Sequence, residues 1–482
     1  MTLIDSARLA WVDGQTVDSD ETFPVLNPAT GESVTDAVDA DTQLIDAAID
    51  AAHAAFPAWS QTPATERAAM LRAWADQIDK HTTEIATITT TEGGKLFREA
   101  RGEVGAGIAA IRWSAQVAED ASDTELPAPS PTRRHYTTTQ PVGVVACITP
   151  WNFPIAAVLV KVAAALAAGC TVVVKPSEET PLVASALAQL SAVAGLPPGV
   201  INVVATETPS LFGDAIASRK EVRAVSFTGS TRVGKLLYEQ CAGTVKRLSL
   251  ELGGNAPFIV FADANIERAA SDAVNARFYN TGQICVGANR FFVHDDIYDE
   301  FADAFSAKVA ALRVGDVMDE GSDIGPLINR RAKDHFTALL ADATAKGATV
   351  ATGGEPLDTD TLFVTPTVLT DTTADMDVYT KEIFGPMACL YRFTEHDDVI
   401  AKANDTDAGL AAYAYSEDNA RLAQVSAQLD AGVVGLNTTQ IFASELPFGG
   451  MKESGIGREW GADCLDEFLE IKSVAFETGG AS

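Results

Sequence analysis

The sequence predicts an α/β protein built on a doubly wound parallel β-sheet, and three observations support that fold class. Short β-rich runs alternate with helix-like segments, the runs are almost continuously apolar, and 482 residues are too many for one hydrophobic core. We therefore expect two or three domains. The β-rich runs are residues 142–148, 171–175, 200–205, 223–227 and 246–250, and the helix-like segments between them are 155–168, 181–194, 209–218 and 231–241.

The segments outside this alternation are predicted from periodicity and composition. Residues 42–60 and 63–88 have the apolar spacing of amphipathic helices. Residues 119–131 are polar and rich in proline, so we expect a loop or a crossing between domains. A second α/β region is expected to follow the first. It would run from Gly253 to about Gly450, with a helix at 299–312 and a strand at 363–369.

The net charge of −31 limits the classes of partner. Nucleic acids and anionic membranes bind basic faces, so neither is expected as a partner of so acidic a chain. The acidic residues are spread along the sequence and form no single tail. A solvated surface explains this distribution. Adaptation to a high-salt cytoplasm is the sharper alternative, because 1 M salt screens charges within about 3 Å.

The six cysteines are scattered, with no Cys-x-x-Cys pair and no histidine at ligand spacing, so no metal site is predicted. Such usage fits a reducing compartment, and the N-terminus lacks the regions of a signal peptide; we expect a cytoplasmic protein. Residues 155–174 are as long and apolar as a membrane span. Lys161 and Gly169 within them favour a buried helix, a glycine C-cap and a buried strand.

Cys285 and Glu251 are the first candidates for chemistry. Cys285 follows Gly282-Gln283-Ile284, and Glu251 precedes a Gly-Gly turn. A cysteine taken alone is more often a buried core residue. A glutamate taken alone is more often a surface carboxylate. Together, a thiol nucleophile and a separate general base indicate covalent catalysis through a thioester. A cysteine hydrolase would need a histidine partner, and none of the six histidines lies in a persuasive motif.

Three loops that follow predicted strands are candidates for binding a dinucleotide. The segment 227–234 joins a strand to a helix, whose N-terminal N–H groups can receive a pyrophosphate; a simple helix cap is the alternative. Leu236 replaces the Ser/Thr of a P-loop, which we reject. Lys175 and Glu178 can form hydrogen bonds with ribose hydroxyls. Glu178 would also repel the 2′-phosphate of NADP, which favours NAD as the cofactor. The alternative is a solvated ion pair between the two side chains. Asn152 is a candidate oxyanion donor or a plain turn residue.

Taken together, these motifs resemble the NAD(P)-dependent aldehyde dehydrogenase family over nearly the whole chain. The segments that carry the resemblance are 150–154 (PWNFP), 175–178 (KPSE), 227–231 (FTGST), 250–255 (LELGGN), 282–285 (GQIC), 382–386 (EIFGP) and 447–455 (PFGGMKESG). Each motif alone is weak, but seven in one order are specific.

The resemblance implies a role for each matching residue. Cys285 would be the nucleophile, Asn152 with the Cys285 backbone N–H the oxyanion hole, and Glu251 the base that activates water. The implied cofactor is NAD or NADP, with NAD favoured by Glu178. The implied cofactor-binding residues are Thr149, Pro150, Trp151, Lys175, Ser177, Glu178, Phe227, Thr228, Gly229, Ser230, Leu252, Glu382 and Phe384.

The family's architecture implies a Rossmann-like cofactor domain, a second α/β catalytic domain and a small β element for oligomerisation into homodimers or homotetramers. The corresponding residues would be 1–121 with 142–252, then 253–450, and finally 122–141 with 469–482. A CoA-acylating relative would have no need of Glu251, and a non-catalytic protein on this fold would have lost Cys285 or Glu251.

The sequence is most similar to the branch that oxidises succinic or 2-oxoglutarate semialdehyde, so a semialdehyde carboxylate is the first expectation for the substrate. The chain departs from that branch at two positions where an arginine usually binds the carboxylate, which here are Val160 and Tyr279. Ser444 or Arg290 would then have to serve the carboxylate. The alternative is a neutral aliphatic or aromatic aldehyde. The predicted pocket residues are Phe153, Val160, Tyr279, Phe442, Ser444 and Phe448.

Overall fold

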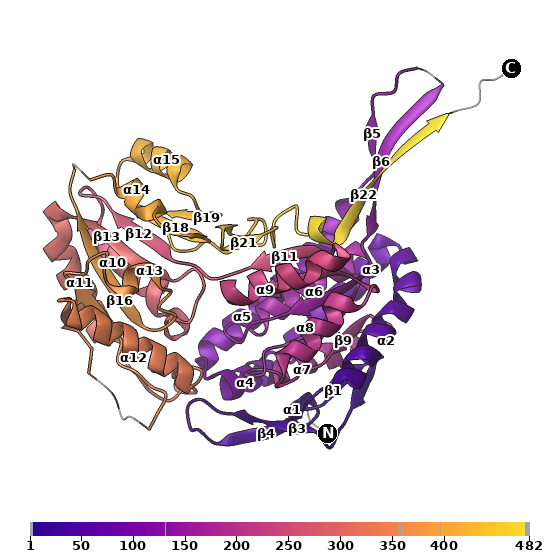
Figure 1. The fold of residues 1–482 in the computed structure, drawn as a ribbon, viewed down its shortest axis with the longest axis horizontal. Helices are drawn as coiled ribbons and strands as arrows, with labels where there is room; N and C mark the ends of the chain where they lie inside the picture. Colours follow the sequence, from indigo (N-terminus) through magenta and orange to yellow (C-terminus); the bar gives the residue numbers. More distant parts are fainter. Residues whose placement is uncertain (1–2, 131, 356, 358–359, 396, 478–482) are drawn as a thin grey trace.

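The structure is a computed structural model that describes residues 3–130, 132–355, 357, 360–395 and 397–477. Two lobes lie side by side, and a narrow sheet projects from one of them (Figure 1). Each lobe contains one large sheet whose central strands are parallel. The chain is therefore an α/β protein, as the alternation of strands and helices predicts.

The first lobe contains the predicted doubly wound sheet. Its parallel strands lie in the order β9-β8-β7-β10-β11, so the chain reverses direction across the sheet between β7 and β10. Antiparallel strands extend both edges. The bounds are β1 Ala10–Val12, β2 Gln15–Val17, β7 Val144–Ile148, β8 Thr171–Lys175, β9 Ile201–Val203, β10 Val222–Thr228, β11 Arg247–Glu251 and β21 Gly455–Ile456.

Helices cover both faces of this sheet, which explains why its central strands are continuously apolar. Apolar clusters fill the space on each side of the strands. The four helices predicted between the strands are all present: α6 Ala156–Ala168, α7 Leu182–Val193, α8 Pro209–Ser218 and α9 Thr231–Cys241. The N-terminal segment adds α1 Leu3–Ala7, β3 Thr22–Leu26, β4 Ser33–Val38, α2 Thr42–Gln61, α3 Ala64–Lys80, α4 Thr82–Gly93 and α5 Phe97–Asp120.

The second lobe is built on a seven-stranded sheet in the order β14-β15-β16-β13-β12-β18-β19, in which all pairs except β14–β15 are parallel. Its two faces are covered by separate apolar clusters. The bounds are β12 Ala256–Val260, α10 Ile266–Phe278, β13 Ala288–His294, α11 Tyr298–Ala310, α12 Arg330–Ala345, β14 Thr349–Thr352, β15 Thr367–Thr370, α13 Asp377–Thr380, β16 Met387–Phe393, α14 Val399–Asn404, β18 Ala411–Tyr415, α15 Asn419–Gln428 and β19 Val433–Leu436.

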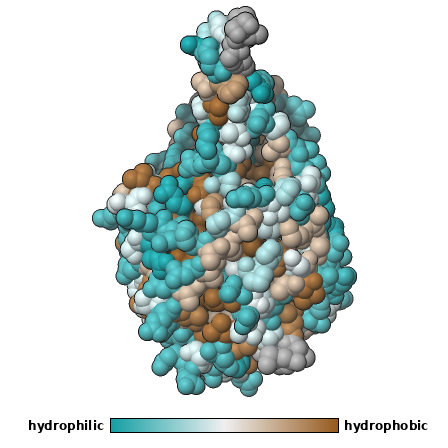
Figure 2. Space-filling view, turned by 90° about the vertical axis from the view of Figure 1, so that its right-hand side faces the viewer, coloured by the Kyte–Doolittle hydropathy of each residue, from teal (hydrophilic) through white to brown (hydrophobic). Residues whose placement is uncertain are grey.

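The projecting sheet has three antiparallel strands, and the C-terminal strand pairs with a strand more than 300 residues earlier. The strands are β5 Thr124–Leu126, β6 Arg133–Pro141 and β22 Leu469–Glu477, and a further short pair joins β17 Ala408–Gly409 to β20 Met451–Lys452. Figure 2 looks along the molecule with this projection at the top, where hydrophobic and hydrophilic residues alternate.

Three predictions about elements were wrong in part. Residues 63–88 form two helices, because the chain leaves helical geometry at His81 and the Thr82 hydroxyl donates to the free carbonyl of Asp79 at 2.8 Å. The proline-rich stretch 119–131 contains the strand β5, and its last residue lies outside the described part. The strand predicted at 363–369 begins only at Thr367, since Pro366 has no N–H to donate to a ladder.

The apolar stretch 155–174 is confirmed as a buried helix and a buried strand. The helix α6 ends at Gly169, which has φ 96°, and β8 follows two residues later. A positive φ is what glycine permits at such a helix end. Among the helices of the described residues, none has the length and apolar character that spanning a bilayer requires.

Candidate active site

Three loops lie at the carboxyl edge of the first sheet, where the strand order reverses. They follow β7, β8 and β10, and in open parallel sheets ligands bind at such a reversal. The Thr149 backbone N–H donates to the Lys175 carbonyl at 3.1 Å, which ties the first two loops together. The Thr149 hydroxyl is buried and has no hydrogen-bond partner in the described part of the chain. A buried donor of this kind is satisfied when a ligand occupies the edge.

The loop after β10 leads into the N-terminus of α9. Ser230 is its N-cap and accepts a hydrogen bond from the Val233 N–H at 3.4 Å, while the Gly229 N–H donates to the Glu251 carbonyl at 3.0 Å. Phe227 and Thr228 form the end of β10 beside this turn. The side chain of Leu252 packs directly on Gly234 in the first turn of α9. The free N–H groups of a helix N-terminus suit a pyrophosphate.

The loop after β8 brings Lys175 and Glu178 together. The Lys175 ammonium lies 3.4 Å from the Glu178 carboxylate and donates to the Pro176 carbonyl at 3.0 Å. Burial lowers the pKa of Lys175, and the charge of Glu178 opposes that effect. Ser177 accepts from the N–H of the following turn at 3.3 Å. A buried ammonium beside a part-exposed carboxylate suits two ribose hydroxyls, so these residues fit a dinucleotide.

The second lobe contributes Glu382 and Phe384 to the same region. The ring of Phe384 meets that of Trp151, which follows Pro150 in the loop after β7, edge to face at a centroid distance of 5.4 Å. The Glu382 carboxylate accepts from the Gly254 N–H at 3.2 Å. Burial raises the pKa of Glu382 to about 7, although the Gly254 N–H and the charge of Arg277 act to lower it. The contact between Trp151 and Phe384 therefore joins the two lobes beside the proposed cofactor site.

Cys285, the predicted nucleophile, lies in a loop with unusual backbone geometry, which we call the nucleophile loop. Asn280, Thr281 and Gly282 have φ values of 50°, 56° and 72°, so three successive residues are left-handed. Such conformations are costly for residues with a Cβ and persist where the surroundings enforce them. Glu99 accepts from the Asn280 N–H at 3.2 Å, and the Thr281 hydroxyl accepts from a backbone N–H at 3.0 Å. The loop before Cys285 is therefore held from both sides.

Asn152 lies against the nucleophile loop. Its side-chain N–H₂ donates to the Gln283 carbonyl at 3.0 Å, and Asn280 donates both to that carbonyl and to the Asn152 carbonyl. Asn152 retains a second side-chain N–H. Cys285 is a free thiol that is partly exposed. Limited hydration raises its pKa to about 12, and the negative charges of Glu382 and Glu251 add to this effect.

Glu251 is buried, and neither of its carboxylate oxygens has a hydrogen-bond partner in the described part of the chain. It ends β11, and Gly449 approaches so closely that a Cβ there would lie 2.7 Å from a carboxylate oxygen. Desolvation raises the pKa of Glu251 well above its usual value, as does the charge of Glu459. A buried carboxyl without a partner is the state expected of a base that acts on a transient water.

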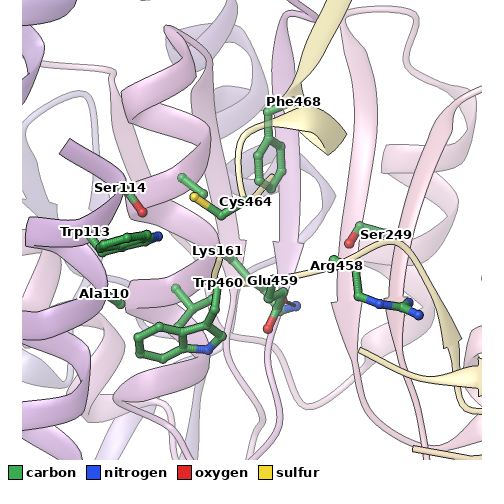
Figure 3. Close-up of a pocket in the computed structure, with 12 residues that line it drawn as sticks. Ala110, Trp113, Ser114, Lys161, Ser249, Arg458, Glu459, Trp460, Cys464 and Phe468 are labelled. Carbon is green, nitrogen blue, oxygen red and sulfur yellow. Dashed lines mark hydrogen bonds and ion pairs between the residues drawn. The ribbon is translucent and has the colours of Figure 1, made fainter. Parts of the chain in front are cut away.

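A buried ion pair lies beside Glu251. The Lys161 ammonium bonds the carboxylate of Glu459 and donates to the Ser226 hydroxyl at 3.2 Å. Figure 3 shows this pair with Trp113 and Trp460 nearby. All four residues line a small cavity of about 10 Å³, which has room for about one water molecule. The charge of Lys161 lowers the pKa of Glu251 whereas that of Glu459 raises it. The two charges of the pair therefore act on the pKa of Glu251 in opposite directions.

The predicted pocket residues form two aromatic pairs. Phe153 and Tyr279 stack at a centroid distance of 6.4 Å, and Phe442 and Phe448 meet at 5.1 Å. The Lys95 ammonium lies 4.0 Å from the centroid of the Phe153 ring. The same ammonium forms a buried ion pair with Glu103. These contacts gather aromatic side chains in two pairs, and a common pocket for them remains a prediction.

Of the two residues suggested for a carboxylate, the structure excludes Arg290. Arg290 is fully buried, and its guanidinium donates to the carbonyls of Asn255, Lys402 and Ala403 in the second lobe. Its donors are used for structure, so this expectation was wrong. Val160 lines the small cavity beside Lys161, and Ser444 lies at an open groove on the surface.

Sequence reasoning did not find the charged residues that support the site. Glu99 and Glu103 on α5 hold the nucleophile loop and the N–H groups at the start of α6. Glu459 is 298 residues from Lys161. The available signal was Lys161 itself, a single charge within a helix that is otherwise apolar. A buried lysine needs an anionic partner, but the sequence could not identify it.

The described residues contain no group of three or more His, Cys, Asp or Glu side chains arranged to hold a metal ion.

Comparisons with known proteins agree on one family. The model of the "Aldehyde dehydrogenase family" matches residues 11–474. A succinate semialdehyde dehydrogenase of Acinetobacter baylyi is 45% identical over 97% of both chains. An NADP(+) succinate-semialdehyde dehydrogenase of Escherichia coli is 44% identical over 96% of both. The crystal structure of succinate-semialdehyde dehydrogenase from Burkholderia pseudomallei superposes with a TM-score of 0.95 at 45% identity, over 97% of this chain and 98% of that one.

Proposed function

This chain belongs to the aldehyde dehydrogenase family, and on that premise we propose that it oxidises a semialdehyde that carries a carboxylate, such as succinic or 2-oxoglutarate semialdehyde. It is an NAD(P)-dependent enzyme that converts an aldehyde to an acid. The observation that carries the reaction type is the buried Glu251 carboxyl without a partner, near the Cys285 thiol. The names of the two relatives support the class of substrate.

The proposed mechanism uses three residues of this chain. The Cys285 thiol gives its proton to solvent water, and the thiolate sulfur adds to the aldehyde carbon. The carbonyl oxygen becomes an oxyanion that the second N–H of Asn152 and the Cys285 backbone N–H can stabilise. The bound dinucleotide supplies a hydride acceptor for the oxidation. Glu251 then takes a proton from a water molecule that attacks the thioester, which releases the acid and restores the thiol.

We further propose NAD as the preferred cofactor. Glu178 has a side chain that is 38% exposed beside the Lys175 ammonium, where a carboxylate would repel a 2′-phosphate. The Escherichia coli relative carries NADP(+) in its name, so the choice is specific to each member. The test is the ratio of kcat/KM for the two cofactors. A clear preference for NADP would overturn this proposal.

The two large sheets and the projection support a division of the chain into three parts. We propose that residues 1–121 and 142–252 bind the cofactor and that residues 253–450 carry the nucleophile. Residues 122–141 with 469–482 would form an oligomerisation element. Ile471 in β22 is 74% exposed, and Phe476 is also exposed, which supports a homodimer or homotetramer. Native mass spectrometry would measure the number of subunits.

The cellular location is also a proposal. All six cysteines are free thiols, which fits the reducing cytoplasm. Fractionation of cells with an antibody against the chain would test it.

The function itself is tested by following cofactor reduction with purified enzyme. Succinic semialdehyde, 2-oxoglutarate semialdehyde, propanal and benzaldehyde would each be supplied with NAD and with NADP, at constant ionic strength. We expect higher kcat/KM for the semialdehydes. Preference for propanal or benzaldehyde would favour the second candidate, a neutral-aldehyde enzyme, which the apolar residues Val160 and Phe153 support.

Two further arms of this assay address the other rival reactions. A rate that depends on CoA would indicate acyl transfer to CoA, which Glu251 argues against. Ester hydrolysis without cofactor reduction would indicate a cysteine hydrolase.

A further inference from the structure

The cations beside the Phe153 ring and around the small cavity are already paired. Lys95 and Lys161 form buried ion pairs with Glu103 and Glu459. The guanidinium of Arg458 donates to the carbonyls of two glycines. A substrate carboxylate placed among these residues would have to break such contacts at a large cost. A carboxylate therefore needs a cation elsewhere, and a chain with a net charge of −31 offers few.

An open groove of about 390 Å³ lies between α5 and the loop that carries Ser444. One wall is a face of α5, and the other wall is the loop. The residues that matter here are Ile108, Arg112, Trp113, Gln116, Ser444 and Glu445. This groove combines apolar side chains with a guanidinium, an amide, a hydroxyl and the Glu445 carboxylate.

The groove adjoins the small cavity beside Lys161 through Trp113. This indole borders both the groove and the small cavity that contains Val160. Its N–H donates to the Gly461 carbonyl at 2.7 Å, and the Gly461 N–H donates to the Ser444 carbonyl at 2.9 Å. Five residues after Ser444 the chain reaches Gly449, which lies against Glu251. Five residues span at most about 18 Å, so one short loop runs from the groove to the Glu251 carboxyl, and the same loop carries Phe442 of the second aromatic pair.

Arg112 is available to bind an anion. In the described part of the chain its ion pair is with Asp76 at 3.0 Å, and the two side chains are 52% and 60% exposed. Exposed pairs of this kind are weak and exchange readily. A guanidinium has five N–H donors and can bind a carboxylate with two parallel hydrogen bonds.

Resting on the proposed function, we propose that Arg112, assisted by Ser444, binds the distal carboxylate of the substrate at the mouth of the pocket. The aromatic pairs Phe153–Tyr279 and Phe442–Phe448 then enclose the methylene chain between this carboxylate and the aldehyde. The site selects ω-oxo acids, and its contribution increases with the length of the chain. This arrangement replaces the arginines that Val160 and Tyr279 exclude.

The test compares Arg112→Gln with the wild type on 6-oxohexanoate, succinic semialdehyde and hexanal at constant ionic strength. Loss of a charge-assisted pair is expected to raise KM for 6-oxohexanoate roughly tenfold or more, with kcat changed less than about twofold. The effect on succinic semialdehyde is expected to be smaller, and that on hexanal below about twofold. Arg112→Lys should restore part of the affinity for 6-oxohexanoate.

Arg101→Gln is the matched control, because Arg101 is an exposed arginine on α5 about 16 Å earlier along the helix and outside the groove. It changes the net charge equally and is expected to leave all three KM values within about twofold. Glu445→Gln should act in the opposite direction and lower KM for 6-oxohexanoate, because its carboxylate lies in the same groove.

The outcomes separate the two proposals. An equal rise of KM for hexanal, an equal effect of Arg101→Gln, or no effect of Arg112→Gln on 6-oxohexanoate would overturn the assignment of Arg112. Failure of the wild type to oxidise any anionic aldehyde while it oxidises hexanal would overturn the proposed substrate class as well. Selective loss of affinity for the longer anion supports both.

Discussion

Glu251 and Cys285 have shifted pKa values for the same physical reason. Both are poorly hydrated, and each lies near other negative charge, so their neutral forms are favoured. Catalysis by Glu251 requires its ionised form, so the rate of deacylation should rise with pH as the proton is lost.

Glu251→Gln should separate acylation from deacylation. The amide keeps the shape of the side chain but cannot take a proton from water, so steady turnover should fall by about 10²–10⁴-fold. A burst of reduced cofactor, equal to the enzyme present, should precede the slow phase, and stopped-flow absorbance would measure it. Cys285→Ala is the control that should abolish both phases. Steady turnover close to that of the wild type would remove Glu251 from its role.

Glu459→Gln should shift the pH dependence of deacylation. The charge of Glu459 raises the pKa of Glu251, so its removal should lower that pKa and move the acid limb of the kcat profile to lower pH. Lys161→Met should move the limb to higher pH, because a stabilising positive charge is lost. The measurement is kcat against pH at fixed ionic strength. An unmoved acid limb in both variants would show that the pair does not act on the base.

At this scale the sequence predicts residue types within motifs and misses partners that are distant along the chain. Cys285 and Asn152 lie on facing loops as the motifs indicate. The contact between Lys161 and Glu459 depends on how the C-terminal segment passes over α6, which no local pattern encodes. Arg290 was misjudged for the same reason, since its neighbours Lys402 and Ala403 come from α14.

Among the elements, the turn after β11 fixes the position of the nucleophile. A Cβ at Gly254 would collide with the Cys285 carbonyl oxygen, so the two loops can meet only because this residue has no side chain. Its N–H also holds Glu382 at 3.2 Å. One glycine therefore positions both the thiol loop and a residue of the proposed cofactor site.

Gly254→Ala should displace the nucleophile loop. We expect kcat to fall by at least about tenfold and unfolding to become easier by about 1–3 kcal/mol, as for other overpacked positions. Gly102→Ala is the control, because Gly102 is exposed within α5 and has open space around it. There alanine should stabilise by about 0.5–1 kcal/mol and leave activity unchanged. Thermal unfolding and kcat would be measured on both; equal behaviour of the two variants would contradict the argument.

The sequence predicted the central elements of the first lobe because alternation and apolar runs are local signals. All five strands and four helices between residues 142 and 251 are present within a few residues of their expected bounds. The predicted bounds were wrong where the apolar or extended pattern of the sequence continues past the point at which the helix or strand ends. The apolar period of 63–88 does not stop at His81, and the extended run before Thr367 cannot enter the ladder at Pro366.

For the whole molecule, the acidic charge is distributed over both lobes, with 66 acidic and 35 basic residues. Many of the ion pairs are exposed, such as those of Arg392 with Asp295 and Asp299, and exposed pairs contribute little stability. The excess negative charge therefore acts mainly as self-repulsion, which opposes the compact state.

Potassium chloride should accordingly raise the melting temperature. Between 0.01 M and 1 M salt the Debye length falls from about 30 Å to 3 Å, so repulsion across the surface is almost fully screened. Because unfolding separates these charges, screening stabilises the folded state more than the unfolded chain. The measurement is Tm by calorimetry across this range, with sorbitol at matched osmolality as the control for solvent exclusion. A Tm that rises equally in sorbitol, or that falls with salt, would mean that surface repulsion does not limit the stability of this fold.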